Sequence, residues 1–199
     1  DLPEVIYARE YDAAISPNGN IPVHAFNLIS PTFFANSSTG NKYSLWVNVY
    51  GVSERYLNVY GEKDLRAQMN QFFHRTYTHP VDGTTLDMKM LCNWYWYDET
   101  AILETGKGTK DWNFYRYAET LLSAAEAIAQ SSGVNAEAAG YLAQVKARAN
   151  MEGKDVSTIA SELQRLGKQA FIEECWKERL REFPLEMKIW DDCVRTGKF

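Results

Sequence analysis

The chain has 199 residues, enough for one good-sized domain or a large piece of a bigger protein, and its 45% hydrophobic and 24% charged residues are ordinary for a globular fold. Its net charge of −5 argues against a general nucleic-acid binder, which needs a basic surface to displace counterions. The three cysteines are odd in number and form no CxxC pair, so a disulfide-rich scaffold is excluded. The sequence contains no run of about 18 apolar residues, the length that a membrane-spanning helix needs.

The first 110 residues are rich in Gly, Asn, Ser, Thr and aromatic residues, with only short apolar pieces. Alternation over residues 4–11 predicts a strand. Residues 16–22 and 36–42 are clusters of turn-forming residues, and residues 53–73 mix a short helix-like stretch with loop. We therefore expect a loop-rich surface, where binding residues tend to be found.

Five aromatic residues surround the polar turn at 36–42. They are Phe33, Phe34, Tyr43, Trp46 and Tyr50, and the same stretch carries Asn36, Asn41 and Asn48. Aromatic rings stack on the apolar C–H faces of a sugar, and amides hydrogen-bond its hydroxyl groups. The stretch is thus a candidate carbohydrate site, although burial in the core is an equally open alternative for any single ring.

Four more aromatic residues stand in a row in the segment LCNWYWYDET (91–100). If this segment is a strand, the two tryptophans, Trp94 and Trp96, point to one face, and the two tyrosines, Tyr95 and Tyr97, point to the other. A ligand platform needs one exposed face, whereas rings on both faces indicate a strand covered on both sides. We predict a structural role for this run.

From Asp111 onward the pattern is helical. Over residues 111–133 the apolar residues recur in steps of three and four, with Asp111 placed to cap the helix and Gly133 to end it. A second helix follows with Asn135 as its expected cap. Two helices joined by so short a connection predict a helical hairpin.

A third helical region runs from about residue 157 to 183, with an interruption expected near Gly167. Pro184 should end it, because proline disfavours a helical conformation in the residue before it. A last short helix carries Trp190, and Gly197 fits the position just past its end. Paired helices of this kind are the units that solenoids stack.

Nothing in the sequence points to catalysis. Glutamates recur every four residues at Glu174, Glu178, Glu182 and Glu186. Carboxylates at this spacing share one helical face, whereas a glycosidase needs two that face each other across a cleft. The glutamates alternate with Lys and Arg, so we expect ion pairs along the helix.

The sequence also lacks the motifs of metal and cofactor sites. His24, His74 and His79 form no HxxxH or HExxH pair. ETGKGTK (104–110) lacks the spacing of a phosphate-binding loop, and no nucleophile motif is present. We expect no catalytic residue, no metal and no cofactor.

Three blocks resemble the SusD/RagB family of bacterial outer-membrane nutrient-binding lipoproteins. RYAETLLSAAEA (116–127) is similar to the family's R-Y-A-E-x-L-L-x-x-A-E-A, and VKARA (145–149) to its V-R-A-R-A. ERLREFPLEMKIWDDCVRTGK (178–198) aligns without a gap to E-R-x-x-E-L-x-x-E-G-x-R-W-x-D-L-V-R-T-G-K. Upstream, YGEKDLR (60–66) looks like the family's Y-x-x-x-D-x-R segment, and PEVIYAREY (3–11) is similar to the strand that opens its C-terminal half.

Several residues of the closing block depart from the family pattern. Met187 replaces the usual Gly, Ile189 stands where an Arg precedes the Trp, Cys193 replaces Leu, and Pro184 is inserted into the helical stretch. These changes bear on local helix geometry. Because family members are considerably longer and begin with a signal and a lipidated cysteine, we expect this chain to be the C-terminal part of a longer protein.

The resemblance implies a mainly α, SusD-like fold of tetratricopeptide-like helical hairpins with a loop-rich segment and a few short strands. Residues 1–110 would be the ligand-facing segment and residues 111–199 the helical core, together forming one domain. The shared charged residues would tie the helices together. They are Arg116, Glu119, Glu178, Arg179, Asp192 and Arg195.

The implied function is not enzymatic. Such a protein would sit at the bacterial cell surface, held in the outer membrane by an N-terminal lipid absent from this chain, and deliver oligosaccharide to a SusC-like TonB-dependent transporter. We expect Trp46, Tyr43 and Phe34 to stack on sugar rings, and Asn41 or Asn48 to bind hydroxyl groups. The rival readings are the same fold capturing peptide or serving only as a transporter lid, and, ranked last, a carbohydrate-active enzyme.

Overall fold

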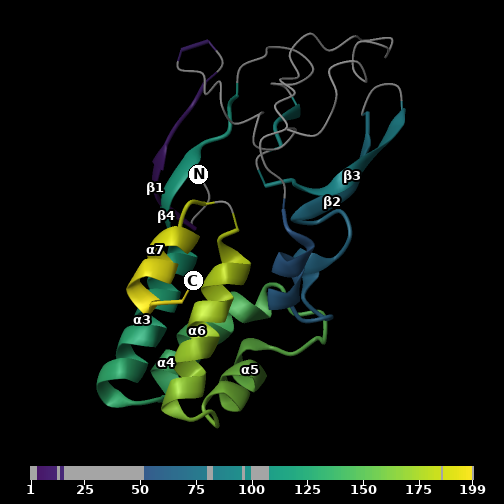
Figure 1. Cartoon of the computed structure of the whole chain (residues 1–199). Coiled ribbons are helices and arrows are strands. Elements are labelled where there is room, and N and C mark those ends of the chain that lie inside the picture. The colour runs from purple at the N-terminus through teal and green to yellow at the C-terminus, as the bar shows by residue number, and fades with distance from the viewer. Residues whose placement is uncertain are drawn as a thin grey trace. The chain divides into compact units, whose positions relative to one another are not determined.

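The computed structural model describes residues 4–12, 14–15, 52–79, 83–95, 97–99, 108–184 and 186–198 (Figure 1). Its elements are, in chain order, β1 (Val5–Arg9), the 3-10 helices η1 (Glu54–Val59) and η2 (Leu65–Ala67), β2 (Phe73–Thr78), β3 (Thr85–Asn93), β4 (Trp112–Arg116), α3 (Tyr117–Ser132), α4 (Ala136–Ala147), α5 (Val156–Leu163), α6 (Lys168–Glu182) and α7 (Ile189–Thr196). The expected mainly helical fold with a few short strands is confirmed.

The chain forms two compact units. The helical unit comprises residues 1–8, 59–65 and 113–199, and the hairpin unit comprises residues 9–58 and 66–112. Segments that lie far apart in the sequence are thus joined in the helical unit, where β1 pairs with β4. The hairpin unit is built on the antiparallel pair β2–β3.

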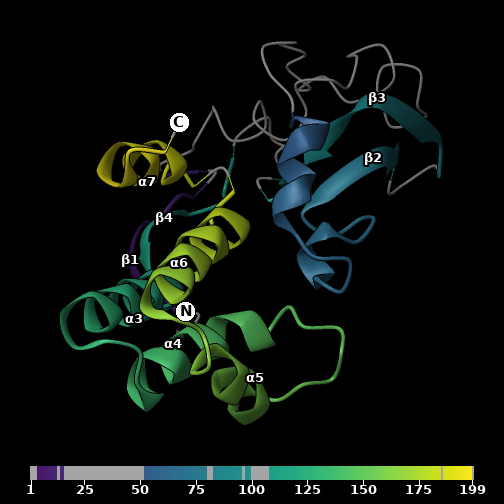
Figure 2. The ribbon, with the colours of Figure 1, turned by 60° about the horizontal axis from the view of Figure 1, so that its bottom comes forward.

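The core of the helical unit lies between α3, α4, α5 and α6, which pack side by side (Figure 2). The predicted stripe on α3 faces this core, with Leu122 and Ala125 completely buried. Leu142 from α4 and Phe171 from α6 are also completely buried. Each large apolar side chain removed from water in this way contributes roughly 1.5–3 kcal/mol to folding.

The predicted helix ends are largely confirmed. Gly133 caps α3, and the Asn135 side chain accepts a hydrogen bond of 2.9 Å from the backbone N–H of Ala138 at the start of α4. Gly167 separates α5 from α6 as expected. Gly197 ends α7 with φ 68°, a left-handed conformation that glycine adopts without a steric penalty.

The predicted start of the first helix is wrong. Residues 112–116 form β4, and α3 begins only at Tyr117, so Asp111 does not cap it. Instead Asp111 accepts a hydrogen bond of 2.9 Å from the backbone N–H of Tyr11. The backbone N–H of Tyr117 bonds to the carbonyl of Glu4, so pairing with β1 fixes where the helix starts.

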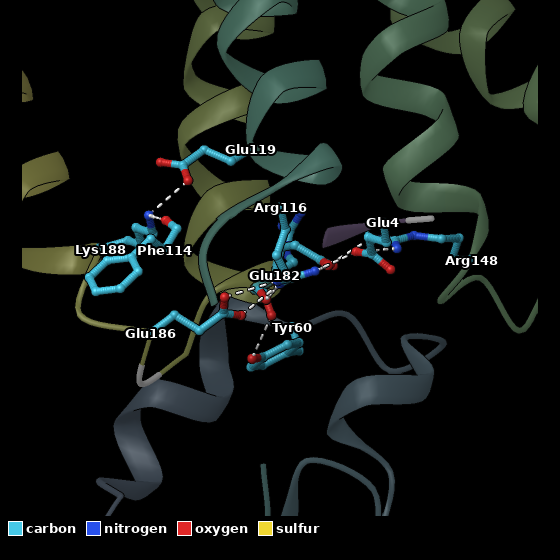
Figure 3. A network of polar contacts seen from close by, with 10 residues as sticks. Glu4, Tyr60, Phe114, Arg116, Glu119, Arg148, Glu182, Glu186 and Lys188 are labelled. Carbon is cyan, nitrogen blue, oxygen red and sulfur yellow. Dashed lines mark hydrogen bonds and ion pairs between the residues drawn. The ribbon is translucent and has the colours of Figure 1, made fainter. Parts of the chain in front are cut away.

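Arg116, the last residue of β4, is the centre of a charged network (Figure 3). Its Nη1 lies 2.5 Å from Glu4 Oε1 and 3.1 Å from Glu182 Oε1. Its Nε and Nη2 donate to the two carboxylate oxygens of Glu186 at 2.9 and 2.6 Å, a bidentate arrangement. Arg148 completes the network by binding Glu4 and Glu182.

A second network joins α3, α6 and α7. Arg179 Nε lies 2.9 and 2.8 Å from the two carboxylate oxygens of Asp192, and its Nη2 lies 3.4 Å from Glu119. Arg195 binds the same Asp192 and also Glu126 of α3. The expectation that these shared charged residues tie the helices together is confirmed.

The ion pairs of the glutamate run differ from the prediction, which placed all of them along one helix. Glu174 and Glu178 do pair with Arg181 of the same helix, at 2.9 and 3.0 Å. Glu182 and Glu186, in contrast, bind Arg116 from another element, and Glu186 lies beyond the end of α6. The run therefore connects elements more than it stabilises its own helix.

Candidate aromatic binding pocket

The predicted sugar-binding residues all fall between residues 16 and 51, which lie outside the described residues. They are Phe34, Asn41, Tyr43, Trp46 and Asn48. Their assignment stays a prediction. The described residues bring together a different set of aromatic side chains, in the hairpin unit.

The aromatic run after β3 is a turn, so the predicted two-faced strand is wrong. β3 ends at Asn93, and the N–H of Tyr97 donates to the carbonyl of Trp94 at 3.0 Å, closing the chain back on itself. As a result Trp94 and Tyr97, predicted to point to opposite faces, stack with centroids 4.8 Å apart and planes 15° apart. Trp96 lies outside the described residues.

His74 and Tyr77 of β2 complete the aromatic cluster. The His74 ring stacks on Trp94 at 4.0 Å with planes 8° apart, and Tyr77 lies 5.5 Å from Trp94 in a tilted arrangement. In a regular strand these two β2 residues would point to opposite faces. The register shift between His74 and Thr76 breaks the alternation, which explains how both reach Trp94.

These rings line an open pocket of about 240 Å³. Its lining residues are Asn70, His74, Thr76, Tyr77, Thr78, Trp94, Tyr97 and Glu99. Sites that enclose a drug-sized ligand usually measure roughly 300–1,000 Å³. The pocket therefore suits a single ring of a larger molecule better than a whole ligand.

Hydrogen bonds on either side of the turn hold the stacked rings in place. Asn93 Oδ1 accepts from the N–H of Tyr95 at 2.9 Å, as an asparagine does when it nucleates a turn. The buried Asp98 accepts from both the N–H and the hydroxyl of Thr109, at 2.6 and 3.0 Å. Lys110 Nζ donates to the carbonyl of Tyr95 at 2.8 Å. The turn is thus fixed before any ligand arrives.

Polar groups form a short chain along one side of the pocket. The hydroxyl groups of Tyr77 and Tyr97 lie 3.4 Å apart, and Tyr97 donates to Glu99 Oε2 at 3.1 Å. Burial is the main cause that raises the pKa of Tyr97, so its hydroxyl keeps its proton. Burial lowers the pKa of His74, which favours its neutral form. Aromatic faces beside hydroxyls and a carboxylate can stack on a sugar ring and bind its hydroxyl groups.

This pocket was not predicted from the sequence, because the aromatic run has the composition of a strand. The local signal was Asn93, which stands directly before the run and whose side chain favours a turn. His74 and Tyr77 carried no comparable signal. Their contact with Trp94 depends on the pairing of β2 with β3 and on its irregular register.

The cysteines do not line this pocket. The three cysteines are free thiols, and burial raises the pKa of Cys92 to about 11 and that of Cys175 to about 12. Within the described ranges, no three His, Cys, Asp or Glu residues gather as a metal site requires. Among the described helices, none is long and apolar enough to cross a membrane.

Several solved structures share this fold. A SusD superfamily protein from Parabacteroides distasonis is 23% identical, with a TM-score of 0.75 over 96% of this chain and 39% of its own. Surface glycan-binding protein A from Bacteroides thetaiotaomicron, solved with laminarihexaose, is 21% identical, with a TM-score of 0.65 over 98% of this chain and 43% of its own. These identities show the fold alone, and the chain spans about two-fifths of each structure.

Surface glycan-binding protein A from Bacteroides uniformis is also 21% identical, with a TM-score of 0.59 over 98% of this chain and 37% of its own. No protein with a curated description matches the chain. The family model described as the SusD family matches residues 32–199. Because this match covers most of the sequence, the chain belongs to the SusD family.

Proposed function

We propose that this protein binds glycans at the bacterial cell surface and delivers them to a SusC-like TonB-dependent transporter. The observation that carries the proposal is the pocket in which His74, Trp94 and Tyr97 stack beside hydroxyl groups and a carboxylate, in a chain of the SusD family. Support for a glycan ligand also comes from the Bacteroides thetaiotaomicron protein of the same fold, solved with laminarihexaose.

The anchoring and transport parts of the proposal follow from the family. We propose that the full-length protein is held in the outer membrane by an N-terminal lipid and covers its transporter. The predicted loop around Trp46 and Tyr43 remains a proposed second contact with the same ligand.

Binding without hydrolysis is the form of the proposal that the pocket favours. A glycosidase flanks its substrate with two carboxyl groups. Among the described lining residues Glu99 is the only one with a carboxylate. The buried glutamates Glu182 and Glu186 belong to the helical unit, where Arg116 binds both.

The first experiment measures binding by calorimetry to a panel of neutral hexasaccharides that includes laminarihexaose. We expect Trp94→Ala to weaken binding to the best of them about tenfold, because a lost aromatic contact costs on the order of 1.4 kcal/mol. Tyr115→Ala is the matched control, because this exposed ring belongs to the helical unit and does not line the pocket.

Two results would contradict the proposal. Capture of peptides with no affinity for any glycan would redirect the function, and release of shorter sugars on incubation would indicate an enzyme. Equal affinity of the parent and Trp94→Ala would remove the pocket from the binding site while leaving glycan binding intact. The double variant Trp46→Ala/Tyr43→Ala then tests the predicted loop separately.

A further inference from the structure

Glu99 is the single charged side chain among the described residues that line the pocket. It is exposed, and it forms no ion pair with any other described residue. Its situation differs from that of Glu54 in the same unit, which lies 2.5 Å from Arg75. The negative charge of Glu99 therefore faces the pocket without a described cation to offset it.

Hydrogen bonding fixes where this charge lies. The Tyr97 hydroxyl donates a hydrogen bond to Glu99 Oε2, and the Tyr77 hydroxyl lies within hydrogen-bond distance of the Tyr97 hydroxyl. Among the described residues none donates to Oε1, so this oxygen can accept a hydrogen bond from a ligand hydroxyl. Burial lowers the pKa of His74, another titratable ring of the pocket, and so disfavours its positively charged form.

We infer that the pocket takes an uncharged sugar ring and rejects rings that carry a carboxylate or sulfate, and that Glu99 is the residue that discriminates. This inference rests on the proposed function. A sugar hydroxyl can donate to the Glu99 carboxylate, whereas an acidic group brings a second negative charge to the same place. Discrimination between ligands often depends on such a repulsive element as much as on attraction.

A matched pair of ligands tests the inference. The probes are the neutral hexasaccharides of the panel and the same sugars after oxidation of their primary hydroxyl groups to carboxylates. We expect the neutral form to bind about five- to tenfold more tightly at low salt, because two like charges about 4 Å apart in water, as in an open pocket, repel by on the order of 1 kcal/mol. Added salt should reduce this ratio, because it screens exposed charges.

Three variants assign the effect to one side chain. Glu99→Gln keeps an oxygen that accepts from Tyr97 but removes the charge, and should bring the ratio close to one. Glu99→Lys should reverse the preference. Glu10→Gln is the matched control, because this exposed carboxylate belongs to the same unit but does not line the pocket, and it should leave the ratio unchanged.

The outcomes separate this inference from the proposal beneath it. If neither form of any sugar binds, the proposed function falls. If sugars bind but the oxidised form binds as tightly as the neutral one, or if Glu99→Gln keeps the full ratio, glycan binding stands and the selectivity inference is overturned. A ratio that responds to Trp94→Ala but not to Glu99→Gln also overturns it.

Discussion

At the scale of single residues, Met187 is the clearest departure from the family pattern, which usually has glycine at this position. Met187 has φ 59°, in the left-handed region, and its side chain is largely exposed. A side chain in this conformation costs roughly 1–2 kcal/mol because its Cβ crowds the backbone. The exchange of glycine for methionine therefore adds strain, and the exposed side chain buries little surface in return.

We expect Met187→Gly to raise the free energy of unfolding by roughly 0.5–1 kcal/mol. Relief of strain outweighs the loss of about 0.4–1 kcal/mol that glycine causes by making the unfolded chain more flexible. Urea denaturation followed by circular dichroism measures the change. Met187→Ala keeps the Cβ and should give no gain, and equal stabilisation by both variants would show that the methionine side chain, not backbone strain, was the cause.

At the scale of elements, Arg116 is the residue that joins β4 to α6 and to the turn that follows it. Its side chain and those of Glu182 and Glu186 are all at least 90% buried. Removing one partner of a buried ion pair leaves the other charges in the protein interior without compensation, at a cost of about 3–5 kcal/mol. Glu186 depends on Arg116 for its bidentate ion pair, whereas Glu182 also binds Arg148.

Arg116→Met should lower the free energy of unfolding by about 3–5 kcal/mol. Arg148→Met is its matched control, because Arg148 binds the same Glu182 but its side chain is 42% exposed. An exposed pair contributes about 0–1 kcal/mol, so this variant should change stability little. If urea denaturation finds the same loss for both variants, burial is not what gives Arg116 its importance.

The elements also show what could be predicted from the sequence. Helix ends set by local chemistry, such as the side-chain cap of Asn135 and the left-handed Gly197, were predicted correctly because they need no distant partner. The strand β4 was not predicted, because Phe114 continues the three- and four-residue spacing of the apolar residues in α3. Its real conformation depends on pairing with β1, about one hundred residues away.

The difference between local chemistry and distant pairing also explains why the pocket was not predicted from the sequence. An aromatic run has a composition compatible with a strand, but here Asn93 Oδ1 accepts from the N–H of Tyr95 and the N–H of Tyr97 donates to the carbonyl of Trp94, which turns the chain. The stacking of His74 on Trp94 then requires an irregular register between two strands, which no local pattern encodes. The fold class was predictable from family motifs, whereas the geometry of this site was not.

At the scale of the whole molecule, the buried carboxylates of the helical unit make its stability depend on pH in two opposing ways. Burial raises the pKa of Glu186 above its ordinary value of 4.5, and Arg116 opposes this shift only in part. For Glu174, burial acts in the same upward direction, but Lys146 and Arg181 outweigh it and the pKa is lowered. Glu4 is likewise lowered, because Arg148 and Arg116 outweigh its burial.

The opposite directions of these pKa shifts predict that the chain is most stable in mildly acidic solution. As pH falls from 7 toward 4.5, the folded chain takes up a proton at Glu186 before the unfolded chain does, so the free energy of unfolding rises. Below 4.5 the unfolded chain binds protons that folded Glu4 and Glu174 resist, so stability is lost as pH falls through their lowered pKa values. Each excess proton changes the slope by at most about 1.4 kcal/mol per pH unit.

Urea denaturation of the whole chain at a series of pH values from 7 to 3 measures how the free energy of unfolding depends on pH. Circular dichroism follows the loss of the helices. Glu186→Gln should abolish the increase in the free energy of unfolding that occurs as pH falls from 7 to 4.5. It should leave the loss of stability below pH 4.5 unchanged. Glu174→Gln should make the acid loss shallower and leave the rise in place. Because the two variants act on opposite sides of pH 4.5, a profile that both change alike would mean that their effects come from altered packing. A profile that neither variant changes would mean that other groups carry the pH dependence.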